Sequence, residues 1–239
     1  MSSGSVQEPT HSELTPTDEI SNQLPSSSAS AGTPSGPLSM IIEAISKAIE
    51  LAKNPVGYMT TDKDSPATTN SVMVNYVSML AAIPFVAILI GDLWYYSALT
   101  HYNEGRIVAV AFVGAILTAI GYVVAVYIVG YIVQALAASF GTAKDQVKSL
   151  KLTAYIYTPA FLLSAFYIIP PLGFLTIIGV LYGLYILYMG IPIVLGTPKD
   201  RVVPYLVAIV VTTLVVYFVI AIIIGVVAAA VLGHAYGFM

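Results

Sequence analysis

Long apolar stretches dominate the chain after about residue 70, and they show none of the period-2 alternation of membrane β-strands. A helix of ~20 apolar residues crosses the ~30 Å hydrocarbon core and satisfies its own backbone hydrogen bonds there. The pattern therefore predicts an all-α membrane protein, a bundle of five transmembrane helices. The expected spans are about 72–90, 107–138, 152–169, 172–195 and 202–232.

The third and fourth predicted spans form a hairpin around a turn at Pro170 and Pro171. No charged side chain occurs between Ile168 and Leu195, so this stretch is expected to lie in the membrane. Pro192 interrupts the fourth span. If the number of spans were even, this segment would enter the membrane and return, and the sequence does not decide between the two arrangements.

A shorter helix is predicted at 37–53, ahead of the first span. Apolar residues recur there at helical spacing, while Glu43, Lys47 and Glu50 share the opposite face. With ~17 residues and several charges, this helix is too short and too polar to cross the bilayer. We expect it to be an amphipathic helix in the membrane interface. Packing on the protein's own cytosolic loops is the alternative.

Polar segments flank this helix on both sides. The stretch 1–36 is rich in Ser, Thr and Pro and has little to bury, which predicts a disordered polar tail. A docking peptide is the other interpretation of this tail. The stretch 54–70 is expected to be a polar linker, and 71–239 to be the five-span domain.

The distribution of lysine and arginine predicts the orientation, because positive residues near the spans stay on the cytoplasmic side. With the N-terminus inside and the C-terminus outside, eight of the nine cations are cytoplasmic and only Arg106 is outside. The eight cytoplasmic residues are Lys47, Lys53, Lys63, Lys144, Lys148, Lys151, Lys199 and Arg201.

Composition agrees with this class and excludes several others. Only 9% of the 239 residues are charged, against ~25% in soluble domains, and no basic run marks a nucleic-acid site. No acidic residue falls at the centre of a predicted span, and His11, His101 and His234 are too far apart in sequence to form a ligand motif. We therefore expect a protein that is not an enzyme, with no cofactor and no metal site.

Tyrosine is unusually frequent, with 17 residues; in the hairpin, three recur every three positions in the fourth span and two face them from the third. Those at mid-depth need a hydroxyl partner, and carbonyls freed by Pro159 and Pro192 are the expected acceptors. The hypothesis is a polar seam between the third and fourth spans; structural satisfaction of two kinked helices is the alternative. The five tyrosines are Tyr155, Tyr157, Tyr182, Tyr185 and Tyr188.

Small residues mark the packing faces of the fourth and fifth spans. Gly179 and Gly183 form a GxxxG pair, and Ala221 with Gly225 forms a similar pair. Such faces serve either packing within the chain or contact between two copies. Between these spans, Thr197 is expected to cap a helix, which either begins there and kinks or begins near Pro204 after a short turn.

The arrangement of small, aromatic and proline residues resembles prokaryotic members of the Yip1 domain family, over about 42–217. The matching residues are Phe140-Gly141-Thr142, Ala154-Tyr155, Tyr157-Thr158-Pro159, the run from Gly183 to Pro192, and Gly196-Thr197-Pro198-Lys199. In eukaryotic relatives the resemblance implies vesicle trafficking at the Golgi and ER, with binding of Rab-type GTPases. Their Asp-Leu-Tyr-Gly-Pro tract precedes the first span, whereas Asp92-Leu93 here follows it and lacks Gly-Pro. The resemblance therefore carries over no binding residue, and it favours a prokaryotic plasma membrane over a Golgi or ER membrane.

These observations predict a non-catalytic integral membrane protein that organises the membrane or recruits partners. The expected partners are the lipid bilayer, a cytosolic protein and further copies of the chain that meet through small-residue faces. The alternative function is a channel or permease for a small solute, which would pass along the tyrosine seam.

Overall fold

The computed structural model describes residues 36–99 and 104–236, and every regular element within these two stretches is helical. The all-α prediction is therefore confirmed for the described part of the chain. The predicted disordered tail lies outside it except for Gly36, and so do His11 and His101. The helices are α1 (Pro37–Lys53), α2 (Pro55–Asp62), α3 (Thr69–Val72), α4 (Ala82–Leu99), α5 (Glu104–Ala137), α6 (Gln146–Leu163), α7 (Thr176–Val194) and α8 (Val202–Tyr236).

Four helical segments of the described chain are long and apolar enough to cross a bilayer, judged by length and composition. They correspond to the first, second, fourth and fifth predicted spans. The third predicted span falls on α6 and the 3₁₀ turn Ser164–Ile168, where Lys148 and Lys151 lower the apolar character of the first turns. The four segments are Thr69–Tyr95, Ala111–Phe140, Pro170–Val194 and Lys199–Ile222.

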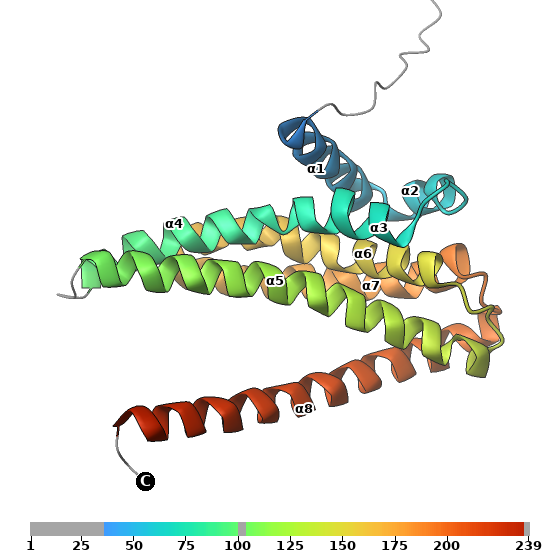
Figure 1. Ribbon diagram of the computed structural model, residues 1–239. Helices are drawn as coiled ribbons and strands as arrows, with labels where there is room; N and C mark the ends of the chain where they lie inside the picture. The colour runs from blue at the N-terminus through green and yellow to red at the C-terminus, as the bar shows by residue number, and fades with distance from the viewer. Residues whose placement is uncertain (1–35, 100–103, 237–239) are drawn as a thin grey trace, which may run out of the picture. The chain divides into compact units, whose positions relative to one another are not determined.

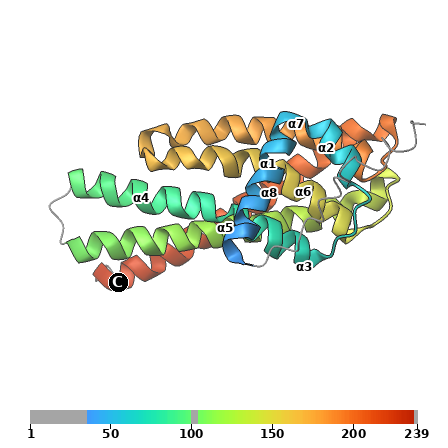
Figure 2. The ribbon, with the colours of Figure 1, turned by 90° about the horizontal axis from the view of Figure 1, so that it is seen from above.

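Helices α4, α5, α6 and α7 run side by side, and each reverses the direction of the one before it (Figures 1 and 2). Helix α8 packs against α5 and α7. Large apolar side chains, such as Leu117 on α5, Leu181 on α7 and Phe218 on α8, are exposed along these helices. An exposed apolar surface of this extent suits contact with lipid, because water would penalise it.

Helix α1 has the bounds expected from its sequence and crosses the bundle on the side of α6 and the π-helical turn Met73–Ser78 (Figure 2). Ala44, Ala48 and Leu51 are buried in these contacts, whereas Leu38 and Ile42 are exposed. One face of α1, which includes Leu51 and the partly buried Ile45, therefore packs on the protein. Leu38 and Ile42 lie outside this contact.

The segment 54–70, expected to be a linker, contains a helix in its first half. Asn54 caps α2 by accepting a 3.0 Å hydrogen bond from the Gly57 amide, and Pro55 takes the first helical position. Proline suits this position, since its missing N–H would find no intrahelical acceptor there. Asp62 is the last residue of α2, and the chain turns toward α3 after it.

The close contact of α6 and α7 depends on the two glycines of the predicted GxxxG pair. A Cβ on Gly179 would lie 2.8 Å from the Cα of Ala160, and a Cβ on Gly183 would lie 2.4 Å from the carbonyl oxygen of Ile156. Any larger residue would therefore collide with the α6 backbone. This face of α7 is occupied within the chain.

Two Gly-Thr turns end α5 and α7 and meet each other. Gly141 and Gly196 have φ of 71° and 68°, a left-handed conformation that glycine adopts without strain and that ends a helix. The following residues, Thr142 and Thr197, are buried and share a hydroxyl–hydroxyl hydrogen bond of 2.7 Å. The expectation that Thr197 caps the next helix is wrong, because its side chain is used in this contact. Helix α8 instead begins at Val202 after a 3₁₀ turn, close to Pro204.

Replacing Thr197 with valine is expected to lower the free energy of unfolding by about 1–3 kcal/mol, because the buried Thr142 hydroxyl loses its partner. The double variant Thr142→Val/Thr197→Val should cost clearly less than the sum of the two single variants. The measurement is a double-mutant cycle by denaturant titration in detergent micelles. Additive costs would show that the two hydroxyls are not coupled.

Candidate functional site

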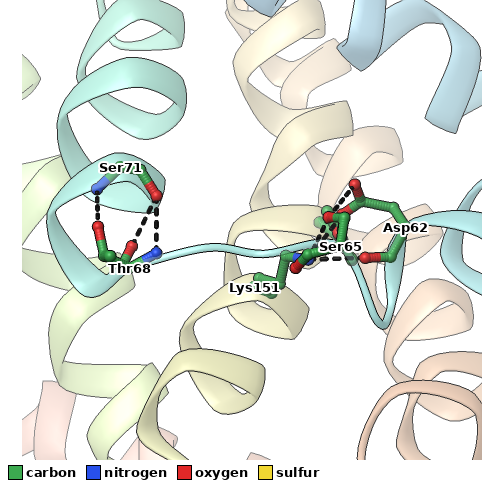
Figure 3. A network of polar contacts seen from close by, with 6 residues as sticks. Asp62, Ser65, Thr68, Ser71 and Lys151 are labelled. Atoms are coloured by element: carbon green, nitrogen blue, oxygen red, sulfur yellow. Dashed lines mark hydrogen bonds and ion pairs between the residues drawn. The ribbon is translucent and has the colours of Figure 1, made fainter.

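The most extensive polar contact in the described chain joins the end of α2 to α6. The Lys151 ammonium lies 3.1 Å from a carboxylate oxygen of Asp62 and donates to the Asp62 carbonyl at 2.7 Å and to the Ser65 hydroxyl at 2.9 Å. The Tyr155 hydroxyl donates to the same Asp62 carboxylate. Figure 3 shows the Lys151 side chain reaching from α6 into the turn that holds Asp62 and Ser65. We call these four residues the α2–α6 latch.

Burial makes the latch sensitive to the loss of any one partner. The Lys151 side chain is 7% exposed and that of Asp62 is 29% exposed. Burial alone would raise the pKa of Asp62, but hydrogen bonds from Tyr155, Ser65 and Lys151 outweigh it and hold this pKa below its ordinary value. Asp62 is therefore ionised at neutral pH, and its charge is compensated within the latch.

Three of the five predicted seam tyrosines have partners on other elements. Tyr155 donates to Asp62, Tyr157 shares a hydrogen bond with Tyr217 of α8, and Tyr182 donates to the Ala52 carbonyl at the end of α1. The expectation that carbonyls freed by Pro159 and Pro192 accept these bonds is wrong for these three tyrosines. Their partners are a carboxylate, a hydroxyl and a helix-end carbonyl of neighbouring elements. The structure thus ties α6 and α7 outward to α1, α2 and α8.

The remaining two tyrosines of the predicted seam and its two prolines make none of these hydrogen bonds to other elements. Tyr185 stacks on Tyr182 with 5.7 Å between ring centroids, and both Tyr185 and Tyr188 are about half exposed on α7. Pro159 and Pro192 lie inside α6 and α7. The structure therefore brings Tyr182 and Tyr185 together and leaves Tyr188 half exposed on α7.

The cations chosen as cytoplasmic loop residues lie at the end of the bundle where α6 and α8 begin. Lys144 is exposed in the turn between α5 and α6, and Lys199 and Arg201 are exposed in the turn before α8. Lys148 belongs to the first turn of α6. Lys151 differs from the rest, since it lies within α6 and is buried in the latch.

Sequence reasoning missed several residues that the structure pairs. Asp62 and Ser65 looked like members of a polar linker, and Tyr76 accepts or donates a 2.8 Å hydrogen bond with Thr158 of α6. Tyr205 of α8 donates to the Val133 carbonyl of α5. The sequence carried no signal for this pairing, because Lys151 directly precedes the third predicted span, 152–169, and a lysine expected in a loop needs no buried partner.

The described residues bring together no group of three His, Asp or Glu side chains that would suit a metal ion. The latch couples an acid to a lysine and a tyrosine, and the contacts of Lys151 and Tyr155 join α6 to the end of α2 and the turn after it. As arranged, these groups anchor α2 and the following turn to α6. Their chemistry is that of a structural junction.

A comparison with protein-family models matches the Yip1 domain over residues 54–223. No curated protein and no solved structure matches the chain. The matched region begins at the cap of α2 and continues into α8, so it takes in the latch, the hairpin and both Gly-Thr turns. The resemblance found in the sequence is thereby confirmed: the chain belongs to the Yip1 domain family.

Proposed function

We propose that this Yip1-family protein is a non-catalytic organiser of its membrane, with five spans, a cytoplasmic N-terminus and an external C-terminus. The antiparallel order of α4 to α8 supports five spans, because α6 runs beside α7, a helix long enough to cross the bilayer. If α6 is counted as a span, the turn before α6 and the turn before α8 lie on the same side of the membrane.

The observation that carries the proposed role is the gathering of cations and of the latch at one end of the bundle. Lys144, Lys199 and Arg201 are exposed there, while Lys151 holds α2 against α6. We propose that this end recruits a cytosolic protein. Helix α1, with Leu38 and Ile42 exposed, lies in the cytoplasmic interface of a prokaryotic plasma membrane.

Site-specific cysteine labelling tests the orientation, since the natural sequence contains no cysteine. Ala143→Cys lies in the exposed turn before α6, and Ser97→Cys lies near the exposed end of α4. In intact cells, a membrane-impermeant maleimide should label Ser97→Cys at once and Ala143→Cys only after permeabilisation. The reverse result would overturn the proposed orientation.

Photo-crosslinking in native membranes tests the recruiting role. A photoreactive residue at Lys144 should capture a cytosolic protein, and the same residue at Ser97 should not. Charge reversal at Lys199 and Arg201 should reduce the capture, because these exposed cations lie at the same end. Recovery of nothing but further copies of the chain would argue for homo-oligomerisation in place of recruitment.

The alternative of a small-solute channel along α6 and α7 has less support. Gly179 and Gly183 lie against the α6 backbone, and Tyr185 and Tyr188 are exposed on another face of α7. A route between these two helices would require them to separate. Solute flux into proteoliposomes that is lost in Tyr185→Phe/Tyr188→Phe without loss of folding would restore this alternative.

A further inference from the structure

A cavity of about 610 Å³ lies between α5, α6, α7 and α8. Its walls are almost entirely apolar, with Ala125, Val180, Leu184 and Ile209 among them, and it is partly open to the surface. The volume falls in the ~300–1,000 Å³ range of sites that hold one small molecule. We call this cavity the α5–α8 crevice.

Two buried hydroxyls without a hydrogen-bond partner line the crevice: those of Thr176 on α7 and Thr213 on α8. Thr176 is only 7% exposed. Some other threonines of the described chain bond to their own helix, as Thr158 does with the Ala154 carbonyl at 2.8 Å. A buried hydroxyl left without a partner is costly, so a polar atom of a bound molecule beside Thr176 would stabilise the site.

A second cavity, of about 500 Å³, lies at the hairpin turn and shares wall residues with the crevice. Tyr122, Thr176 and Val180 line both cavities, while Tyr167 and Pro170 belong to the second. The second cavity has the more polar walls and is the more open of the two. Together they form an amphipathic path, with its polar part at the turn, its apolar part inside the bundle and Thr176 at the junction.

We infer that this path binds one membrane phospholipid. One hydrocarbon chain lies in the α5–α8 crevice, and an oxygen of the glycerol linkage accepts a hydrogen bond from Thr176. The site rests on the proposed membrane placement, which puts the hairpin turn at the external surface, at the depth of lipid headgroups. A phospholipid fits the order of polar and apolar walls, because its own polarity changes over the same distance.

The volume of the crevice favours a lipid chain over a helix from a second copy. A helix with its side chains is ~10 Å across and rises ~5.4 Å per turn, so the crevice would hold fewer than about two turns. A single hydrocarbon chain is far narrower and can follow an irregular apolar path. The lack of charged residues among the walls also disfavours a polar solute.

Photo-crosslinking of the full chain in phosphatidylcholine vesicles tests this site. A fraction of the lipid carries a diazirine in its acyl chain, and labelled residues are mapped by mass spectrometry. Labelling should concentrate on the crevice walls, and Leu184→Trp should reduce it there at least fivefold by filling the space. The matched control is Leu181→Trp on the same helix, which is 63% exposed, lies outside both cavities and should leave the labelling unchanged.

A milder variant keeps the test independent of misfolding. Thr176→Val preserves the side-chain shape and removes only the hydroxyl, so it should reduce phosphatidylcholine retained in native mass spectrometry by fivefold to tenfold. Uniform labelling of all apolar surfaces, unchanged by Leu184→Trp, would overturn the site while leaving the membrane placement intact. Labelled dimers that join through the crevice would show that a second copy occupies it. Absence of label around Leu181 would overturn the membrane placement and the site together.

Discussion

Replacing Gly183 with alanine is expected to lower the free energy of unfolding by about 3 kcal/mol, because the α6–α7 contact has no room for a methyl group. The added Cβ would lie 2.4 Å from the carbonyl oxygen of Ile156, a backbone atom that cannot move aside without shifting α6. Gly179→Ala should act in the same direction, since its Cβ would lie 2.8 Å from backbone atoms of Ala160. The measurement is reversible unfolding in mixed micelles with increasing SDS.

Gly114 supplies the matched control for this prediction. It lies inside α5, and apart from its neighbours in the chain and the backbone of its own helix nothing lies within 4 Å of the position of its Cβ. Gly114→Ala should therefore be neutral, or stabilising by up to ~1 kcal/mol through helix propensity. Equal destabilisation by Gly114→Ala and Gly183→Ala would contradict the packing argument, because it would attribute both effects to the loss of glycine itself.

Replacing Lys151 with methionine is expected to lower the free energy of unfolding by about 2–3 kcal/mol and to release α2 from α6. Breaking a fully buried ion pair costs ~3–5 kcal/mol, and the partial exposure of Asp62 reduces this figure. Asp62 would keep its bonds from Tyr155 and Ser65 but would lose its only cation in the latch. Hydrogen exchange of the amides of 55–65 should speed up at least tenfold.

The exposed pair of Glu43 and Lys47 on α1 supplies the control for the latch. Its charged atoms lie 2.6 Å apart, closer than those of the latch, but both side chains are nearly half exposed. Lys47→Met should therefore change the free energy of unfolding by no more than ~0.5 kcal/mol. Comparable losses for Lys47→Met and Lys151→Met would show that burial does not set the strength of the latch.

The lowered pKa of Asp62 adds a pH dependence to the same junction. A carboxyl group whose pKa is depressed in the folded state stabilises the fold above its unfolded pKa, near 3.8, and loses that contribution as the pH falls through its folded pKa. The latch should therefore be intact at neutral pH and should open in acid. In Asp62→Asn this acid-dependent part of the α2 exchange rate should disappear.

The family pattern is largely explained by packing and chain reversal. Gly183 lies against Ile156, and the two Gly-Thr turns end α5 and α7 and join through their hydroxyls. Thr158 bonds its own helix and Tyr76. These residues of the family pattern therefore shape the bundle.

The class of the protein, the helical bounds of α1 and the approximate extents of the apolar helices could be predicted from the sequence. The bounds of α1 follow from local features: Pro37 at its first position, apolar residues at helical spacing, and the capping residue Asn54 at its end. The apolar helices follow from length and hydropathy alone, which depend on no distant residue. The partner of the Thr197 hydroxyl could not be predicted, because a helix cap is visible in the local sequence whereas Thr142 is 55 positions away.

The sequence by itself determined that the described part of the chain is helical, where its long apolar helices lie, and which turns carry its cations, since each of these depends on composition within a short window. Only the tertiary structure decided which polar groups meet. Lys151 and the Asp62 carbonyl are 89 positions apart, and Thr142 and Thr197 are 55 apart. The same holds for the unpartnered hydroxyls of Thr176 and Thr213, which line one crevice because α7 and α8 pack around it. Such pairings depend on how close-packed helices place their faces, and no local pattern encodes that placement.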